Sequence, residues 1–181
     1  PTIIFGTGRE TIPGSLYALR LEDFVRSDVK NSIRIDSGNT KGFIAPPVIA
    51  DLSGDGIGEI VVTTMDGYMK SYSGKDFSLM WSKRIHPRAE VQSMPAPLYF
   101  DEDEVPDFFN TFNLGEWPKN HTTIHAILSG VDGRELFRDT LGILQFSSPV
   151  LLDYNEDSFP DVVYAINTEE WDVFPVYKTQ L

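Results

Sequence analysis

The sequence has no cysteine among its 181 residues. This absence excludes disulfide scaffolds, zinc sites with cysteine ligands and thiol nucleophiles, while it leaves the cellular compartment open. Long hydrophobic runs are also missing, because none approaches the ~18 residues of a membrane-spanning helix.

Positive charge is scarce as well. The chain has 15 Lys and Arg residues against 27 Asp and Glu residues, which gives a formal net charge of −12. Such a surface repels the phosphates of nucleic acids and anionic membranes, so we expect no nucleic-acid partner. The composition, 41% hydrophobic and 23% charged, is typical of a globular unit with a sizeable core.

Common catalytic signatures are absent from the sequence. No Ser-His-Asp order with a nucleophile elbow occurs, and no phosphate-binding glycine loop leads from a strand into a helix. His121 and His125 are four residues apart and would share one face of a helix, as in some zinc sites. Because Thr122, Thr123 and Ile124 favour a strand, we interpret both as ordinary surface or half-buried histidines. We therefore expect no enzyme.

An acidic loop at residues 51–59 is the most informative motif. Hard cations such as Ca²⁺ take six to eight oxygen ligands, and a short loop supplies them when alternate residues point inward and glycines allow a tight path. The flanking runs are β-branched, unlike the helices that flank an EF-hand loop. We predict a Ca²⁺ site with side-chain oxygens at loop positions 1, 3, 5 and 9 and a backbone carbonyl at position 7, from Asp51, Ser53, Asp55, Glu59 and Ile57.

The loop recurs twice. The later copy, between Val150–Leu152 and Val162–Tyr164, predicts a second Ca²⁺ site from Asp153, Asn155, Asp157, Asp161 and the Phe159 carbonyl. The middle copy, counted from Asp101 to Asp107, is two residues shorter and has Val105 at its fifth position. We interpret it as a hydrated turn, or as a loop that kept the shape and lost the ion.

The three loops begin at residues 51, 101 and 153, and strand-rich periods of this length are typical of propeller blades. Within one period, strands are expected at 60–65, 68–73 and 79–85, and the approach to Asp51 adds a fourth. The predicted fold is all-β: a partial β-propeller of roughly three to four four-stranded blades, in which the first has lost its acidic loop. The approximate blades are residues 1–42, 43–92, 93–145 and 146–181.

Propellers close with about four to eight blades, so we expect more blades from residues beyond this chain or from a partner. A membrane anchor could also lie outside these residues. The segment 113–123 reads as an insertion within a blade, with Trp117 expected to be exposed. Asn120-His121-Thr122 in this insertion fits an N-glycosylation acceptor at Asn120.

The strand-loop-strand setting of residues 51–59 and 153–161 resembles the calcium loops of FG-GAP repeats, the blades of integrin-α-type propellers. The resemblance covers roughly residues 43–175. Phe-Gly occurs only at Phe5-Gly6, and a Gly-Ala-Pro element is missing. The turns at Asp66-Gly67 and 129–133 are more similar to those of quinoprotein-type blades, so the chain resembles hybrid propellers of membrane-anchored ectodomains.

This resemblance implies Ca²⁺-stabilised blades with an adhesion or partner-binding role on the extracellular or lumenal side. The expected function is a non-enzymatic module for protein binding, adhesion or structural assembly, whose protein partner the sequence does not identify. The alternative is a propeller enzyme, either a quinone-dependent dehydrogenase or a polysaccharide-acting enzyme, which needs a cofactor or a carboxylate pair in the central channel. A third reading is a scaffold subunit of a large assembly.

Overall fold

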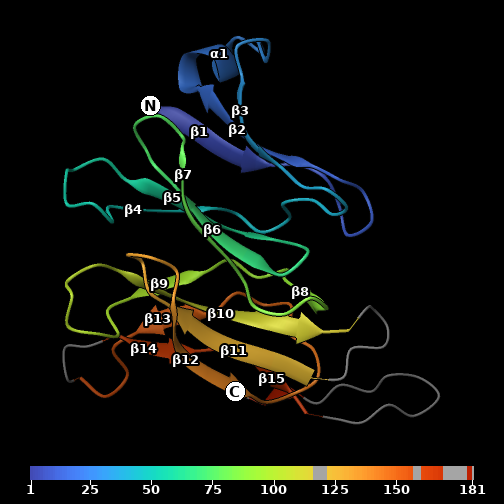
Figure 1. Cartoon of the computed structure of the whole chain (residues 1–181), viewed down its shortest axis with the longest axis vertical. Helices are drawn as coiled ribbons and strands as arrows, with labels where there is room; N and C mark the ends of the chain where they lie inside the picture. Colours follow the sequence, from blue (N-terminus) through green and yellow to red (C-terminus); the bar gives the residue numbers. More distant parts are fainter. Residues whose placement is uncertain (116–121, 157–159, 169–178, 181) are drawn as a thin grey trace.

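The computed structural model of the chain describes residues 1–115, 122–156, 160–168 and 179–180 (Figure 1). With 44% strand and 3% helix, the chain is all-β, which confirms the predicted class. Its strands form several small antiparallel sheets, and none of them closes on itself within the described residues. The helix α1 (Leu21–Val25) has five residues, and no described helix is both long and apolar enough to cross a membrane.

The first two sheets follow simple up-and-down order. The first contains β1 (Thr2–Gly6), β2 (Ser15–Arg20) and β3 (Ile33–Ser37), in the order β1-β2-β3. The second contains β4 (Val48–Ala50), β5 (Glu59–Thr64), β6 (Tyr68–Tyr72) and β7 (Leu79–Arg84), in the order β4-β5-β6-β7.

The third sheet has an interrupted first strand. Its elements are β8 (Ala89–Glu90), β9 (Ala96–Leu98), β10 (Asp107–Leu114), β11 (Thr122–Leu128) and β12 (Glu135–Thr140). Both β8 and β9 pair with β10, at opposite ends of the same edge. Pro95 and Pro97 lie in this segment, and since proline lacks an N–H group, it is confined within sheets to edges and bulges.

The remaining strands form two short pairs. β13 (Val150–Leu152) pairs with β14 (Asp161–Val163), and β15 (Ile166–Asn167) pairs with β16 (Thr179–Gln180).

The strands of the second sheet match the sequence prediction to within one residue at each end. β5 is buried along its whole length, which explains why its residues read as a continuous β-branched run instead of an alternating one. Gly67, in the turn between β5 and β6, has a φ of 83°, a conformation that glycine adopts without steric cost. In the expected insertion at 113–123, β10 and β11 extend into both ends, and Trp117 and Asn120 lie outside the described residues.

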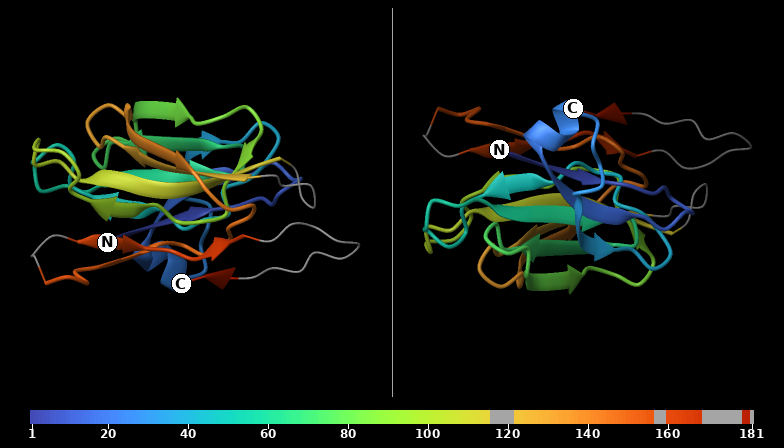
Figure 2. Two further views of the ribbon diagram at one scale, coloured as in Figure 1. Left: turned by 90° about the horizontal axis from the view of Figure 1, so that it is seen from below. Right: turned by 90° about the horizontal axis from the view of Figure 1, so that it is seen from above.

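The first three sheets lie one after another along the long axis of the molecule (Figure 1). Viewed along that axis, their strands run in roughly the same direction, with loops at the two ends (Figure 2). Apolar clusters fill the spaces between successive sheets. The cluster between the first and second sheets contains Leu16 and Ile60. The cluster between the second and third sheets contains Val61 and Phe108, and the one between the third sheet and the β13–β14 pair contains Phe109 with Val162 packed against it.

Hydrogen bonds also link neighbouring sheets. The Trp81 Nε1–H of β7 donates to the Gly130 carbonyl of the β11–β12 turn at 2.8 Å, within the core. The Asp36 carboxylate of β3 accepts from Lys70 Nζ at 2.6 Å and from the Tyr72 hydroxyl, both on β6. The first sheet is therefore held to the second, and the second to the third, by directional contacts as well as by apolar burial.

Replacing Trp81 by phenylalanine tests the link between the second and third sheets. The Trp81→Phe variant leaves the buried Gly130 carbonyl without its donor, so the free energy of unfolding should fall by about 1–3 kcal/mol. Chemical denaturation measures the change. Tyr154→Phe, at a side chain 80% exposed, is the control and should change stability by less than about 0.5 kcal/mol. Equal stability of Trp81→Phe and the native protein would contradict the assignment.

Candidate cation-binding loops

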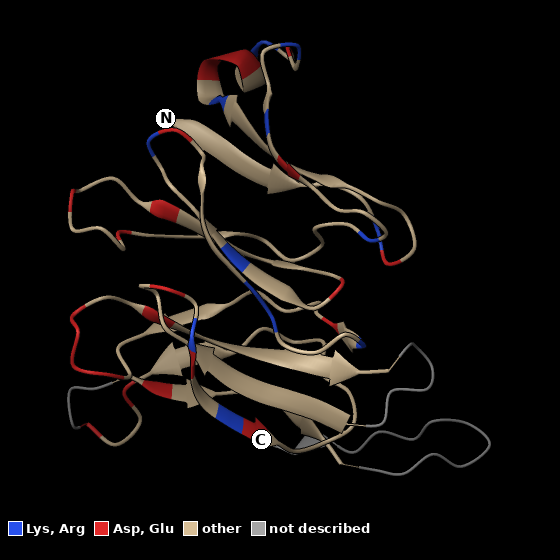
Figure 3. Cartoon of the chain, viewed as in Figure 1, with Lys and Arg blue, Asp and Glu red and all other residues tan. Residues whose placement is uncertain are grey.

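Three acidic loops occupy the same place in three successive strand pairs. In the strand register, Ala50 pairs with Glu59, Leu98 with Asp107, and Leu152 with Asp161, so each pair encloses eight residues. The loops are therefore residues 51–58, 99–106 and 153–160. Figure 3 shows the described parts of the three loops on the same side of the molecule, at the left in that view.

The prediction that the middle loop is two residues shorter is wrong. Counting from its first acid, Asp101, misplaced the start, because the register puts Tyr99 at position 1. Asp101, Asp103 and Asp107 then fall at positions 3, 5 and 9, and Val105 falls at position 7 instead of position 5. The middle loop thus lacks only the first carboxylate of the pattern. Aligning the loops on the acid that begins the second strand would have found this in the sequence.

All three loops share one hydrogen-bonding arrangement, which we call the position-9 clamp. The carboxylate at position 9 accepts the backbone N–H of position 2, at 2.7 Å from Leu52 to Glu59, 2.9 Å from Phe100 to Asp107 and 2.9 Å from Tyr154 to Asp161. In the first two loops it also accepts the N–H of position 3, at 3.2 and 3.3 Å. The clamp joins the start of each loop to the strand that follows it.

The first and middle loops also agree at position 5. The carboxylates of Asp55 and Asp103 accept the N–H of Ile57 and Val105, at 2.8 and 3.0 Å. Both loops have a residue of positive φ at position 6, Gly56 at 81° and Glu104 at 61°. Since a non-glycine residue at such a φ is strained, Glu104 shows that the middle loop keeps the path without the glycine that favours it.

In the first loop, internal hydrogen bonds and an ion pair occupy the predicted ligands. The two oxygens of Asp51 accept from the N–H groups of Gly54 and Gly56, both at 2.8 Å. The Asp55 carboxylate pairs with Lys75 from the β6–β7 turn. Lys75 and the Ile57 N–H hold the pKa of the Asp55 carboxyl below its usual range. Glu59 is buried, and Ser53 and Ile57 are exposed.

The middle loop brings its acids closer together. Asp101, Asp103 and Asp107 each offer a carboxylate oxygen within 4.8 Å of the others, and they form the only such group of three in the part of the chain that the structure describes. Burial raises the pKa of the Asp107 carboxyl, although the N–H groups of Phe100, Asp101 and Gly130 oppose the shift. Arg134 pairs with Asp101 at 3.1 Å.

The third loop is described in part. Asp153 and Asn155 are exposed, and Asp161 makes the position-9 clamp. The predicted ligands Asp157 and Phe159 lie outside the described residues. The acids of the first predicted site are therefore bonded to other groups of the protein, and the second predicted site is described only in part. The three acids that lie close together belong to the middle loop, where we expected no ion.

A tight turn packs against each of the first two loops. The turns at 73–78 and 129–134 share their closing bonds, Ser73 N to Ser78 O at 2.9 Å and Ser129 N to Arg134 O at 2.8 Å. Their glycines, Gly74 and Gly130, lie so close to the carbonyl of loop position 8 that a Cβ at either would collide with it. Because the turns lie so close, the side chain of Lys75 reaches Asp55, and that of Arg134 reaches Asp101.

His125 is buried, which corrects the interpretation of this residue as a surface or half-buried histidine. It lies in β11, 2% exposed, and its Nε2 donates to the Leu141 carbonyl at 2.8 Å. Its ring centroid lies 6.3 Å from that of Phe109 and 4.8 Å from that of Tyr164. The buried Nδ1 has no partner among the described residues. Burial lowers the pKa of the imidazole, although the Leu141 carbonyl and Asp139 oppose this. His121 lies outside the described residues.

Comparison with models of known protein families and with curated proteins found no match for this chain. The likeness to FG-GAP propellers consequently remains an interpretation of the loops and of their spacing.

The position-9 clamp predicts which acid of the middle loop stabilises the fold. Replacing Asp107 by alanine leaves three N–H groups, of Phe100, Asp101 and Gly130, without their acceptor, so the free energy of unfolding should fall by about 2 kcal/mol or more. Glu102→Ala removes the same charge from an exposed position of the same loop and is the matched control. Equal denaturation midpoints for the two variants would refute the clamp.

His125 predicts a loss of stability in mild acid. Because folding lowers the pKa of the ring, its neutral form stabilises the protein above the unfolded value of about 6.5, and this contribution is lost as the pH falls below that value. Denaturation at pH 7 and pH 5 should show a smaller decline for His125→Phe, which keeps an aromatic ring. His86→Gln, in a loop, should decline as the native protein does. If the native protein and His125→Phe lose the same stability between pH 7 and pH 5, other titrating groups cause the loss.

Proposed function

We propose that the chain is a non-enzymatic binding and structural module, part of a β-propeller of four-stranded sheets whose rim loops bind Ca²⁺. The observation that carries this proposal is the equivalence of the three acidic loops. They have the same length, the same strand register and the same position-9 clamp. Sheets that repeat in chain order, each packed on the next, support the propeller architecture.

The middle loop gives the most direct support for a cation. Three carboxylates with oxygens within 4.8 Å repel one another, and burial raises the pKa of one of them, Asp107. A divalent cation among these oxygens would favour the charged form of every member. Asp101 and Asp103 would bind it with side-chain oxygens, and Asp107 would supply an inner ligand or orient the loop through its backbone bonds.

In the first loop, the positive charge beside the acids comes from Lys75. Its ammonium pairs with Asp55, and Arg134 pairs with Asp101 in the same way in the middle loop. A Ca²⁺ ion that binds Asp51, Ser53, Asp55 and the Ile57 carbonyl would displace Lys75 and loosen the bonds from Gly54 and Gly56 to Asp51. Cation binding therefore competes with these internal contacts. The affinity of the first loop for Ca²⁺ should consequently depend on Lys75 in the β6–β7 turn.

The proposed setting is the extracellular or lumenal side of the secretory route, on a membrane-anchored parent protein. The resemblance of the acidic loops to those of FG-GAP repeats supports this setting, and bound ions would offset part of the net charge of −12. The module would bind a protein partner through loops at one end of its sheets, with Trp117 and a glycan at Asn120 in the same insertion.

Thermal melting with Ca²⁺ and with a chelator tests the cation role. Binding to the folded state alone stabilises it by about 3 kcal/mol at a hundredfold excess over Kd. The midpoint should therefore rise with Ca²⁺, and calorimetric titration should give a stoichiometry of one ion or more. A midpoint that is the same in Ca²⁺ and chelator, together with no heat of binding, would refute the proposal.

Variants of the loops sharpen this test. Asp103→Asn should remove the middle-loop ion and reduce both the stoichiometry and the stabilisation, whereas Glu102→Gln in the same loop should leave both unchanged. Lys75→Ala should tighten binding at the first loop by removing the competing ammonium, and Lys30→Ala is its control on an exposed residue. A Lys75→Ala variant with native affinity would exclude an ion at Asp55.

A further inference from the structure

One apolar layer contains an ionisable ring where the layer before it contains a thioether. We call the layer between the second and third sheets the second layer, and that between the third sheet and the β13–β14 pair the third layer. In the second sheet Met69 of β6 pairs with Thr63. In the third sheet His125 of β11 pairs with Thr111. Both threonines are the fifth residue of their strand, so Met69 and His125 occupy equivalent positions, at 0% and 2% exposure.

The His125 ring contacts both the segment that leads into the β13–β14 pair and the segment that leaves it. Its Nε2–H donates at 2.8 Å to the carbonyl of Leu141, in the connection from β12 to β13. The ring lies against Tyr164, the residue after β14, with 4.8 Å between the ring centroids, and it also stacks on Phe109 of β10. His125 therefore joins the third sheet to both ends of the pair.

The second ring nitrogen of His125 is the sensitive point. Since a carbonyl oxygen only accepts hydrogen bonds, Nε2 carries the proton, and Nδ1 keeps its lone pair. Nδ1 is buried and has no hydrogen-bond partner among the described residues. A proton added there would place a charged N–H group in the third layer without an acceptor, which costs free energy. When the layer opens, water supplies the acceptor, so uptake of a proton favours the open form.

The groups that face the ring do not compensate for its charge. Asp139 of β12 pairs with His125 in the strand register and favours the charged ring, but it is exposed, and the effect of burial on the imidazole pKa is larger. Tyr164 is neutral because burial and Asp139 raise the pKa of its hydroxyl. Phe109 of β10 and residues 141–145 of the connection carry no charge.

We propose that His125 is an acid-sensitive latch that holds the β13–β14 pair on the third sheet. The neutral ring keeps the third layer closed. Protonation at Nδ1 opens it, and the pair separates with the acidic loop between its strands, while the first three sheets stay packed on one another. Because burial lowers the pKa of the folded ring, the neutral form stabilises the closed layer above about 6.5, and this contribution is lost as the pH falls below that value.

Single cysteines test the latch, because the chain has none of its own. Ile127→Cys reports on the third layer and Val61→Cys on the second. The latch is independent of Ca²⁺, so labelling by a dipyridyl disulfide is measured in chelator and divided by the rate for the denatured chain at the same pH. Between pH 7 and pH 5 the relative rate should rise about tenfold at Ile127→Cys and less than about twofold at Val61→Cys. No rise at Ile127→Cys, or an equal rise at both, would overturn the proposal.

An exchange of the two equivalent side chains assigns the effect to the ring. His125→Met places the residue of the second layer in the third and should abolish the acid-dependent labelling of Ile127→Cys. Met69→His should introduce acid-dependent labelling at Val61→Cys. His86→Gln, in a loop, is the control and should change neither. Acid-dependent labelling that persists in His125→Met would overturn the proposal, and where a variant does not fold, the comparison of the two cysteines in the native background decides.

Discussion

The carboxylate that begins the second strand of each acidic hairpin fixes the start of its own loop, and in the middle hairpin it also bonds to the neighbouring turn. Asp107 accepts N–H groups from the start of its own loop and from Gly130 in the next turn, and the Gly130 carbonyl in turn accepts from Trp81 in the preceding sheet. A chain of hydrogen bonds thus runs from the rim loop through the turn to the adjacent sheet. Glu59 and Asp161 bond the same position of their own loops. Burial raises the pKa of the Asp107 carboxyl, although the N–H groups that it accepts oppose the shift.

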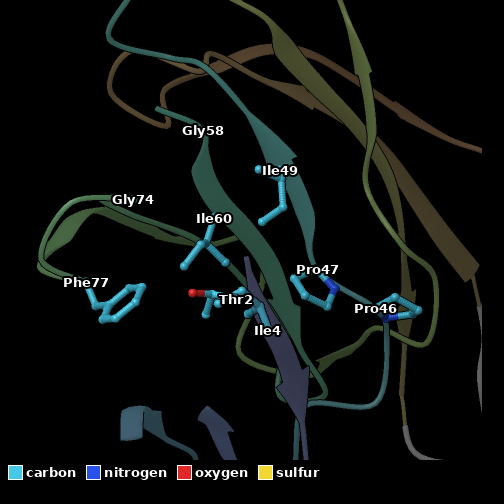
Figure 4. A pocket seen from close by; sticks show the side chains of 9 residues that line it. All are labelled: Thr2, Ile4, Pro46, Pro47, Ile49, Gly58, Ile60, Gly74 and Phe77. Carbon is cyan, nitrogen blue, oxygen red and sulfur yellow. The ribbon is translucent and has the colours of Figure 1, made fainter. Parts of the chain in front are cut away.

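Stacking of the sheets follows from central strands that are buried on both faces. β5 is buried throughout and β10 almost throughout, so one covering layer cannot satisfy either. Each sheet therefore contacts the sheets before and after it, and polar pairs such as Asp36 with Lys70 add directional contacts to the apolar layer. The layer between the first and second sheets also contains a pocket, whose lining includes Ile4, Ile49 and Ile60 (Figure 4).

Local features of this fold could be predicted from the sequence, and long-range ones could not. The strands of the second sheet were predicted to within a residue, because β-branched and aromatic runs alternate there with the Asp66-Gly67 and Gly74–Asp76 turns. The start of the middle loop was misplaced because its first acid, Asp101, stands at position 3, and only pairing with Leu98 shows this. The bonds of Asp55 with Lys75 and of Asp101 with Arg134 join residues from separate turns, which no spacing within one loop indicates. Closure of the sheets into a ring depends on contacts between residues far apart in the sequence, which strand and turn patterns do not indicate.

One backbone hydrogen bond, from position 2 to the carboxylate at position 9, recurs in all three loops. Hydrogen exchange of the amides of Leu52, Phe100 and Tyr154 tests it most directly, because all three residues lie in loops and outside the strand ladders. The account predicts that all three exchange slowly, as strand amides do, while the amide of Glu102, for which no acceptor is found among the described residues, exchanges as fast as an open loop. Fast exchange at Leu52, Phe100 and Tyr154 alike would contradict it.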